Sequence, residues 1–198
     1  EGEWSATWAH PEEDAALTVR MPAGGVDELI TAITEPPLQP GNPETMRYLL
    51  GRNVQPDDPP LERTYISTIE PHRKNPVIKR VTRLACEAAD EQTVGLAIER
   101  QGATDYLHSS TFADQTHRWT GAPKPLEAAA EFAMVTVDES GVQRACVING
   151  THMQYGDFSL SPDEPPTGEI LSADPNSNTV VIDRPLDFPD AYQGSVIT

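Results

Sequence analysis

Proline positions constrain this chain more than any other feature. Nineteen prolines occur in 198 residues, and three clusters of them lie at 35–40, 56–60 and 164–166. A proline inside a helix removes a hydrogen bond and clashes with the preceding turn, whereas loops between strands accommodate it readily. The clusters divide the sequence into short segments, and such segments favour a strand-and-loop fold over a helical one.

Within these segments, apolar and polar residues alternate with the period of two that is typical of strands. The predicted strands are 4–8, 16–21, 28–33, 46–53, 63–70, 77–86, 93–100, 105–110, 131–138, 142–149, 168–173 and 179–183. Residues 125–132, with three consecutive alanines, suit either one short helix or a loop that leads into the next strand. We therefore predict an all-β chain, an antiparallel β-sandwich or stacked-sheet domain with long proline-rich loops.

The length of 198 residues suits one domain of ordinary size or two small ones, and we predict a single β domain over residues 1–198. The sequence does not begin with Met, and residues 194–198 resemble a strand that has just begun. We therefore expect the C-terminal part of a longer protein, with its last strand truncated. No signal peptide and no run of 18 apolar residues is present.

Charge is distributed unevenly along the chain. The formal net charge is −17, an excess of carboxylates that repels nucleic acid and anionic membranes, so we expect neither as a partner. Residues 63–83 nevertheless carry six Arg and Lys against one acid, Glu70, a local charge of +5 that leaves −22 elsewhere. An anionic ligand is expected to bind in this segment. The alternative is that these charges only solvate a strand face and its turn.

Residues 65–81, YISTIEPHRKNPVIKRV, concentrate these charges between two apolar runs. A carboxylate beside an imidazole is the chemistry of acid–base catalysis, yet the segment holds no second base and no group to orient the first. We predict a strand, a cationic turn and a strand, with Glu70 bonded to backbone amides or to an arginine. The candidate substrate-binding residues are His72, Arg73, Lys74 and Arg80.

No familiar catalytic or metal-binding motif occurs elsewhere in the sequence. The five histidines have no standard ligand spacing, so we expect no metal site and no cofactor. Cys86 and Cys146 are 60 residues apart, which leaves two alternatives. They are either free, buried thiols or a single disulfide, and the disulfide would imply an exported protein.

Three segments of the sequence carry a family resemblance. Residues 65–81, then VGLAIER at 94–100 and TDYLHSS at 104–110, resemble the late part of the heparinase II/III-like polysaccharide lyases. In that family a strand motif ending in Glu-Pro-Tyr precedes a strand pair and an Asp-Tyr strand, and here His72 takes the place of that tyrosine. The likeness is fullest over 46–110, thinner over 131–198, where 185–197 is similar to the closing strand, and weak before 46.

The resemblance implies a parent enzyme with an α/α toroid and β-sandwich domains, secreted or periplasmic, that cleaves uronate-containing polysaccharide by β-elimination. The catalytic residues and zinc ligands of the family have no matching positions in this chain. It would then be an ancillary β domain, inactive alone, whose partners are the other domains of the parent chain and an acidic polysaccharide. The alternatives are a ligand-free interaction domain and a carbohydrate-binding β-sandwich module, for which Trp4, Trp8 and Trp119 are candidate platform residues.

Overall fold

The computed structural model describes residues 3–10, 12–24, 26–36, 40–41, 44–54, 64–86, 92–161, 168–177 and 179–183. Every regular element in these ranges is a β-strand and every pairing is antiparallel, which confirms the predicted all-β antiparallel fold. No helix able to cross a bilayer occurs in the described part of the chain. The chain divides into two units, residues 1–161 and 162–198, and the single domain stays a prediction. The expected last strand at 194–198 lies outside the described residues.

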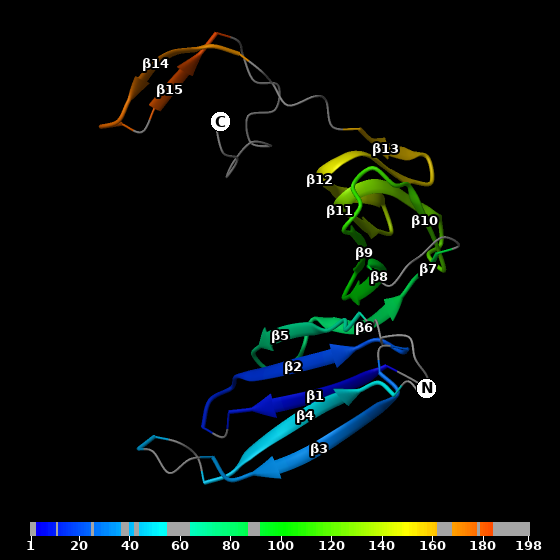
Figure 1. Cartoon of the computed structure of the whole chain (residues 1–198), viewed down its shortest axis with the longest axis vertical. Helices are drawn as coiled ribbons and strands as arrows, with labels where there is room; N and C mark the ends of the chain where they lie inside the picture. The colour runs from blue at the N-terminus through cyan, green and yellow to red at the C-terminus, as the bar shows by residue number, and fades with distance from the viewer. Residues whose placement is uncertain are drawn as a thin grey trace. The chain divides into compact units, whose positions relative to one another are not determined.

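The N-terminal half of the first unit contains a three-stranded sheet and a separate hairpin (Figure 1). The sheet has the order β1 (Trp4–Ala9), β2 (Ala16–Met21) and β5 (Thr68–His72), and the hairpin joins β3 (Glu28–Thr34) to β4 (Met46–Arg52). The predicted end of the strand 63–70 is wrong, because β5 continues through Pro71, which lies opposite Leu17, to His72. In the described sheet β5 lies at the edge, where a residue without an N–H is tolerated.

The two faces of the β1–β2–β5 sheet differ in polarity. One face is apolar and carries Trp4, Ala6, Trp8, Leu17, Val19, Met21, Ile69 and Pro71. On this face Trp8 is 41% exposed and Ile69 is 64% exposed. The opposite face carries the buried polar residues Thr18, Arg20 and Glu70. Hydrogen bonds, rather than apolar packing alone, therefore hold this part of the sheet together.

The C-terminal half of the first unit is an eight-stranded sheet that curls into an almost closed barrel-like form. Its strands are β6 (Ile78–Arg83), β7 (Ala85–Cys86), β8 (Thr93–Arg100), β9 (Ala103–Ser110), β10 (His117–Thr120), β11 (Leu126–Asp138), β12 (Gly141–Tyr155) and β13 (Phe158–Leu160). The path β11–β9–β8–β6 continues through Leu84 into β7, which pairs with β10, and β10 pairs with β11 again. Leu84 is the one residue between β6 and β7, and its amide donates to the Gly95 carbonyl of β8 (2.8 Å). We call this circuit the ring.

The interior of the ring is the main apolar core of the described chain. Its members, all under 8% exposed, include Ala97, Tyr106, Trp119, Leu126, Val135, Met153 and Tyr155. A helix or a loop was predicted for residues 125–132, but residues 126–132 form the first half of β11 instead. Pairing with β10 on one side and β12 on the other buries Ala128 and Ala130, and this tertiary gain overrides their helix propensity. Cys86 and Cys146 are free and partly buried, in line with the first of the two alternatives.

The second unit contains one described hairpin, as predicted. It joins β14 (Ile170–Asp174) to β15 (Thr179–Ile182) in antiparallel pairing. The Asp174 carboxylate accepts hydrogen bonds from the Asn176 amide (2.9 Å) and the Ser177 hydroxyl (2.8 Å). An aspartate in this position fixes the turn locally, because its side chain replaces a backbone acceptor.

Candidate functional site

Glu70, the carboxylate of the motif at 65–81, is fully engaged by its own scaffold. Its Oε2 lies 2.9 Å from Arg20 Nη1, and the two side chains are 9% and 8% exposed. Its Oε1 accepts from the amides of Val77 and of Ile78, the latter at 3.1 Å. This confirms the predicted structural role. Glu70 therefore joins the second strand of the sheet to the start of β6 through three hydrogen bonds.

His72 lies two residues further along β5, on the same polar face. Its Nε2 is 2.9 Å from the Thr18 hydroxyl, which is itself 2.8 Å from the Thr7 hydroxyl. Its Nδ1 is buried and has no hydrogen-bond partner in the described structure. The imidazole is therefore part of a chain of polar groups across three strands, and its Nε2 faces the sheet and not a ligand.

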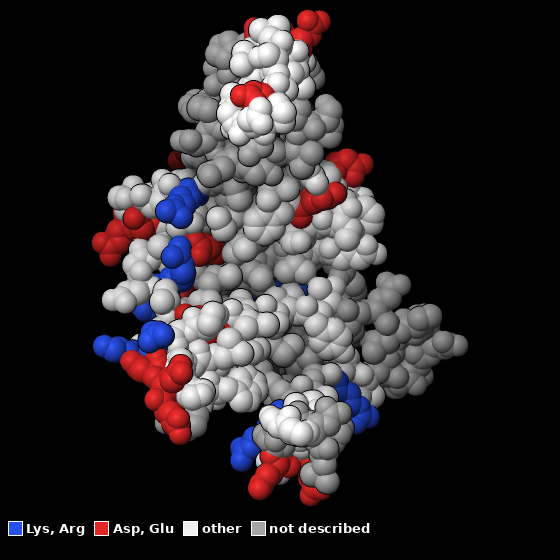
Figure 2. All heavy atoms as spheres, turned by 90° about the vertical axis from the view of Figure 1, so that its left-hand side faces the viewer, with Lys and Arg blue, Asp and Glu red and all other residues white. Residues whose placement is uncertain are grey.

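The other three candidate residues fall into two groups. Arg73 and Lys74 follow β5 in an exposed turn, where Lys74 has φ 61°, and neither forms an ion pair with a described carboxylate. Arg80 is on β6, and its Nε lies 3.1 Å from Glu99 Oε1 and 3.2 Å from the Thr82 hydroxyl. Of these three, Arg73 and Lys74 are thus the ones without an ion pair to any carboxylate that the structure describes. On the face drawn in Figure 2, cationic side chains lie close to acidic ones and form no broad patch of one sign.

The tryptophans do not form the aromatic platform that a carbohydrate-binding module needs. Trp119 is 1% exposed and fills the ring, so its candidacy as a platform residue is wrong. Trp4 and Trp8 share one face of β1, as their spacing predicts, and only Trp8 is largely exposed. One exposed indole is less than a platform of several aromatic faces.

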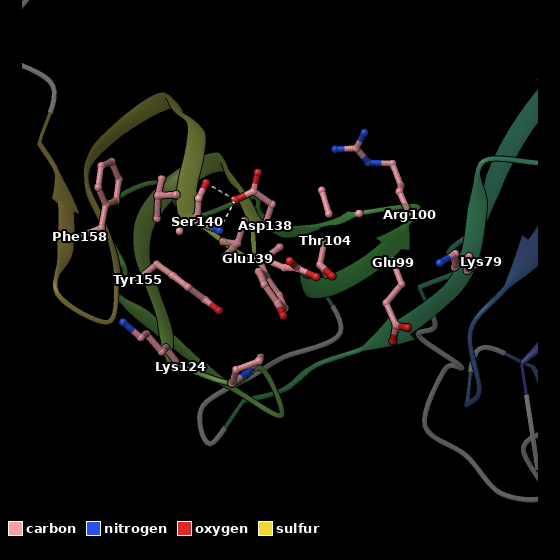
Figure 3. Close-up of a pocket in the computed structure, with 17 residues that line it drawn as sticks. Lys79, Glu99, Arg100, Thr104, Lys124, Asp138, Glu139, Ser140, Tyr155 and Phe158 are labelled. Atoms are coloured by element: carbon pink, nitrogen blue, oxygen red, sulfur yellow. Dashed lines mark hydrogen bonds between the residues drawn. The ribbon is translucent and has the colours of Figure 1, made fainter.

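A groove of about 690 Å³ lies where the turns of the ring meet (Figure 3). The β8–β9, β11–β12 and β12–β13 hairpins line it, together with Lys79 of β6 and the loop before β11. Tyr106 and Tyr155 are among its lining residues but are almost fully buried, and their rings stack on each other with centroids 5.1 Å apart and planes at 21°. Burial, followed by the neighbouring Tyr106, raises the pKa of Tyr155 to about 12, so its hydroxyl stays protonated at any physiological pH.

A buried pair of histidines beside Trp119 was not anticipated from the sequence. His108 Nδ1 accepts from Trp119 Nε1 (3.0 Å), and His108 Nε2 lies 2.8 Å from the Ala130 carbonyl oxygen. Because a carbonyl only accepts, Nε2 carries the proton and the imidazole is neutral. His117 stacks on it, with centroids 5.4 Å apart. The sequence contained one indication that His108 is buried: alternation along the strand places it on the same face as Tyr106.

Acid will destabilise the ring through His108. Burial, and to a lesser extent the neighbouring His117, lowers the pKa of His108, which is 0% exposed, below its ordinary 6.5. The unfolded chain therefore takes up this proton first, so the stabilisation is complete above about pH 6.5 and is lost as the pH falls toward the lower, folded-state pKa. We expect the free energy of unfolding to fall by at most ~1.4 kcal/mol per pH unit in this window.

Urea unfolding above and below pH 6.5 measures this dependence. His108→Gln, whose amide is able to donate to Ala130 and accept from Trp119, should flatten the profile, while His10→Gln on the surface should leave it unchanged. Equal slopes for the His108→Gln variant and the parent chain would contradict the assignment.

No metal centre is apparent in the ranges that the structure describes, where no three His, Cys, Asp or Glu side chains are placed to hold an ion. Comparison with known proteins adds no identification. No protein-family model, no curated protein and no solved structure matches the chain.

Proposed function

We propose that this chain is the ancillary β domain of a polysaccharide lyase that cleaves uronate-containing polysaccharide by β-elimination, and that it holds no catalytic residue itself. One observation carries the proposal. The segment with the strongest likeness to such lyases uses its only carboxylate, Glu70, to bind Arg20 and two backbone amides. A general base must be able to reach a proton of the substrate. A buried carboxylate that already accepts three hydrogen bonds from its own chain is not placed to do so. The segment is therefore a structural junction, which suits a domain that braces its neighbours.

The partners that follow from this role are the other domains of the parent chain and an acidic polysaccharide. Arg73 and Lys74 provide two exposed cations with no ion pair to a described carboxylate, next to a chain that is otherwise strongly acidic. Polyanion contact at this turn is supported by that local charge. An enzyme of this kind acts on extracellular material, so a secreted or periplasmic location is part of the proposal.

The test is the full open reading frame from which this chain comes. We expect its product to release unsaturated uronates from alginate, polygalacturonate or heparan sulfate, followed by ultraviolet absorbance, and this chain alone to release none. Lyase activity of the isolated chain, or a full-length product that cleaves none of the three, would contradict the proposal. Deleting this chain from an active enzyme should lower its melting temperature if the domain braces the catalytic part.

The carbohydrate-binding module is the weaker alternative. It depends on exposed aromatic faces, and Trp119 is inside the ring. Binding of a neutral glucan by the isolated chain, lost on Trp8→Ala, would favour it over the lyase proposal.

A further inference from the structure

We infer that a second copy of this chain docks on the apolar face of the β1–β2–β5 sheet, across a two-fold axis that runs along the strands. The inference does not rest on the proposed function, because it uses only the exposure and the charges of this sheet. An antiparallel sheet with one solvated face normally places its polar side chains on that face. Here the polarity is reversed: Thr18, Arg20 and Glu70 are at most 8% exposed, while the apolar face is partly open to solvent.

A continuous apolar row crosses the three strands near one end of this sheet. Trp8 of β1 lies opposite Leu17 of β2, and Leu17 lies opposite Pro71 of β5. Trp8 is 41% exposed, Leu17 is 38% exposed, and Pro71 is exposed as well. Ile69, two residues before Pro71 on the same face, is 64% exposed. Contiguous apolar side chains on a surface mark an interaction site, whereas single exposed ones are ordinary.

Two exposed turns of opposite charge flank the same end of the sheet. Ala16, the first residue of β2, lies opposite His72, the last residue of β5, so the turn before β2 and the turn after β5 are at one end (Figure 1). None of the charged side chains in these turns forms an ion pair with a described residue of opposite charge. The acidic turn, on the β1 side, carries Glu12, Glu13 and Asp14, and the cationic turn, on the β5 side, carries Arg73 and Lys74.

A two-fold axis along the strands makes these features self-complementary. Rotation about this axis keeps the strand direction and exchanges the two edges of the sheet, so β1 of one copy faces β5 of the other and β2 faces β2. Trp8 then lies over Pro71 of the second copy, Leu17 lies near its own counterpart, and each acidic turn faces a cationic turn. An axis across the strands would instead place both turns over the far end of the sheet, at Trp4 and Met21, without these charge contacts. The charges therefore favour an aligned pair of stacked sheets.

The size of the sheet predicts a weak dimer. Three strands of five or six residues, ~4.8 Å apart and rising ~3.3 Å per residue, cover roughly 300 Å² in plan, against about 800 Å² per partner in a standard interface. We therefore expect a dimer that dissociates on dilution. Arg73 and Lys74 are also the cations proposed above to contact a polyanion, so an acidic polysaccharide would compete with the second copy for them.

Sedimentation equilibrium of the whole chain, from about 10 µM to about 1 mM, tests the inference. The formal charge of −17 on each copy opposes association, so the solution contains ~0.15 M salt, which screens charges more than about 8 Å apart. We expect a monomer–dimer equilibrium. Leu17→Glu, at the axis, should weaken the dimer at least tenfold, because it places two like charges in the apolar contact. Ile33→Glu is the matched control: this isoleucine is 67% exposed on β3, outside the sheet, and its replacement should change nothing.

Exchange of the charges tests the orientation of the two copies. One variant carries Arg73→Glu and Lys74→Glu, and the other carries Glu12→Lys, Glu13→Lys and Asp14→Lys. Each variant alone brings like charges together and should dimerise at least tenfold more weakly than the parent chain. An equimolar mixture of the two should recover a dimer, because every acidic turn then faces a cationic one.

Three results would overturn the inference. A chain that stays monomeric at about 1 mM would leave the apolar face to a different partner, such as another domain of the parent protein. A dimer that Leu17→Glu does not weaken would place the contact elsewhere on the chain. A mixture of the two charge variants that dimerises no better than either variant alone would exclude the two-fold axis along the strands. Melting temperatures confirm that the variants fold, and all the substituted side chains are exposed.

Discussion

Replacing Glu70 with glutamine will lower the free energy of unfolding of this chain by about 3–5 kcal/mol, a large part of the 5–15 kcal/mol typical of a domain. The amide oxygen is able to keep the two backbone donors, Val77 and Ile78, but its NH₂ group then faces the Arg20 guanidinium. A buried cation without a counter-charge costs far more than the pair contributed when intact. The loss of stability is therefore due to Arg20, which stays buried without a counter-charge.

Urea denaturation monitored by circular dichroism measures this loss. Glu28→Gln is the matched control, because the Glu28–Arg52 pair at 3.2 Å is more than half exposed on both sides and should contribute less than about 1 kcal/mol. Adding Arg20→Met to Glu70→Gln should recover part of the stability by removing the unpaired charge. A Glu70→Gln chain as stable as Glu28→Gln would show that Glu70 is not structural, and would reopen its use as a base.

The second large effect is expected from Gly95→Ala in β8. An added Cβ would lie 2.4 Å from two ring atoms of Trp119 and 2.9 Å from a third. The indole is 1% exposed, bonds to His108 and packs inside the ring, so it has no free space into which to move. Overpacking of a core costs 1–3 kcal/mol and sometimes more, and we expect about 3 kcal/mol or failure to fold.

Gly102→Ala provides the comparison for this variant. Gly102 is in the adjacent β8–β9 turn with φ +80°, and an added Cβ there has nothing within 4 Å. Its cost is therefore backbone strain alone, about 1 kcal/mol. Equal melting temperatures for the two variants would mean that Trp119 does not occupy the space above Gly95. Trp119→Phe combined with Gly95→Ala should restore part of the stability, since a smaller ring leaves room for the methyl group.

The predicted strands show where sequence patterns are informative and where they are not. The 131–138 and 142–149 hairpin follows from alternation and a glycine turn, both local properties, and β11 and β12 contain it. The first half of β11 was not predicted, because three consecutive alanines show no alternation of apolar and polar residues. Their burial depends on the pairing of β11 with β10 and β12, which the local sequence does not show. The bounds of β5 were predicted wrongly because a proline indicates the end of a strand, unless that strand is known to lie at the edge of its sheet.

The candidate site was predictable to a smaller extent. The structural role of Glu70 follows from an acid placed before a proline beside apolar runs, although its partner Arg20 lies 50 residues away and carries no local signal. The exposure of Arg73 and Lys74, which form no ion pair with a described carboxylate, also agrees with the local excess of cations. The groove was not predictable, because its lining residues come from β6, β8, β9, β11 and β12, which lie side by side only through strand pairing.

Closure of the ring has a consequence for the order of folding. The β8–β9 and β11–β12 pairings are hairpins between neighbours in sequence, whereas the contact that closes the circuit joins Cys86 to Trp119. Distant contacts cost more chain entropy and form later than local ones. The two-residue strand β7 is thus the element whose pairing closes the ring, and we expect it to form last and open first. Hydrogen exchange at its amides should therefore be faster than at the amides of the hairpins.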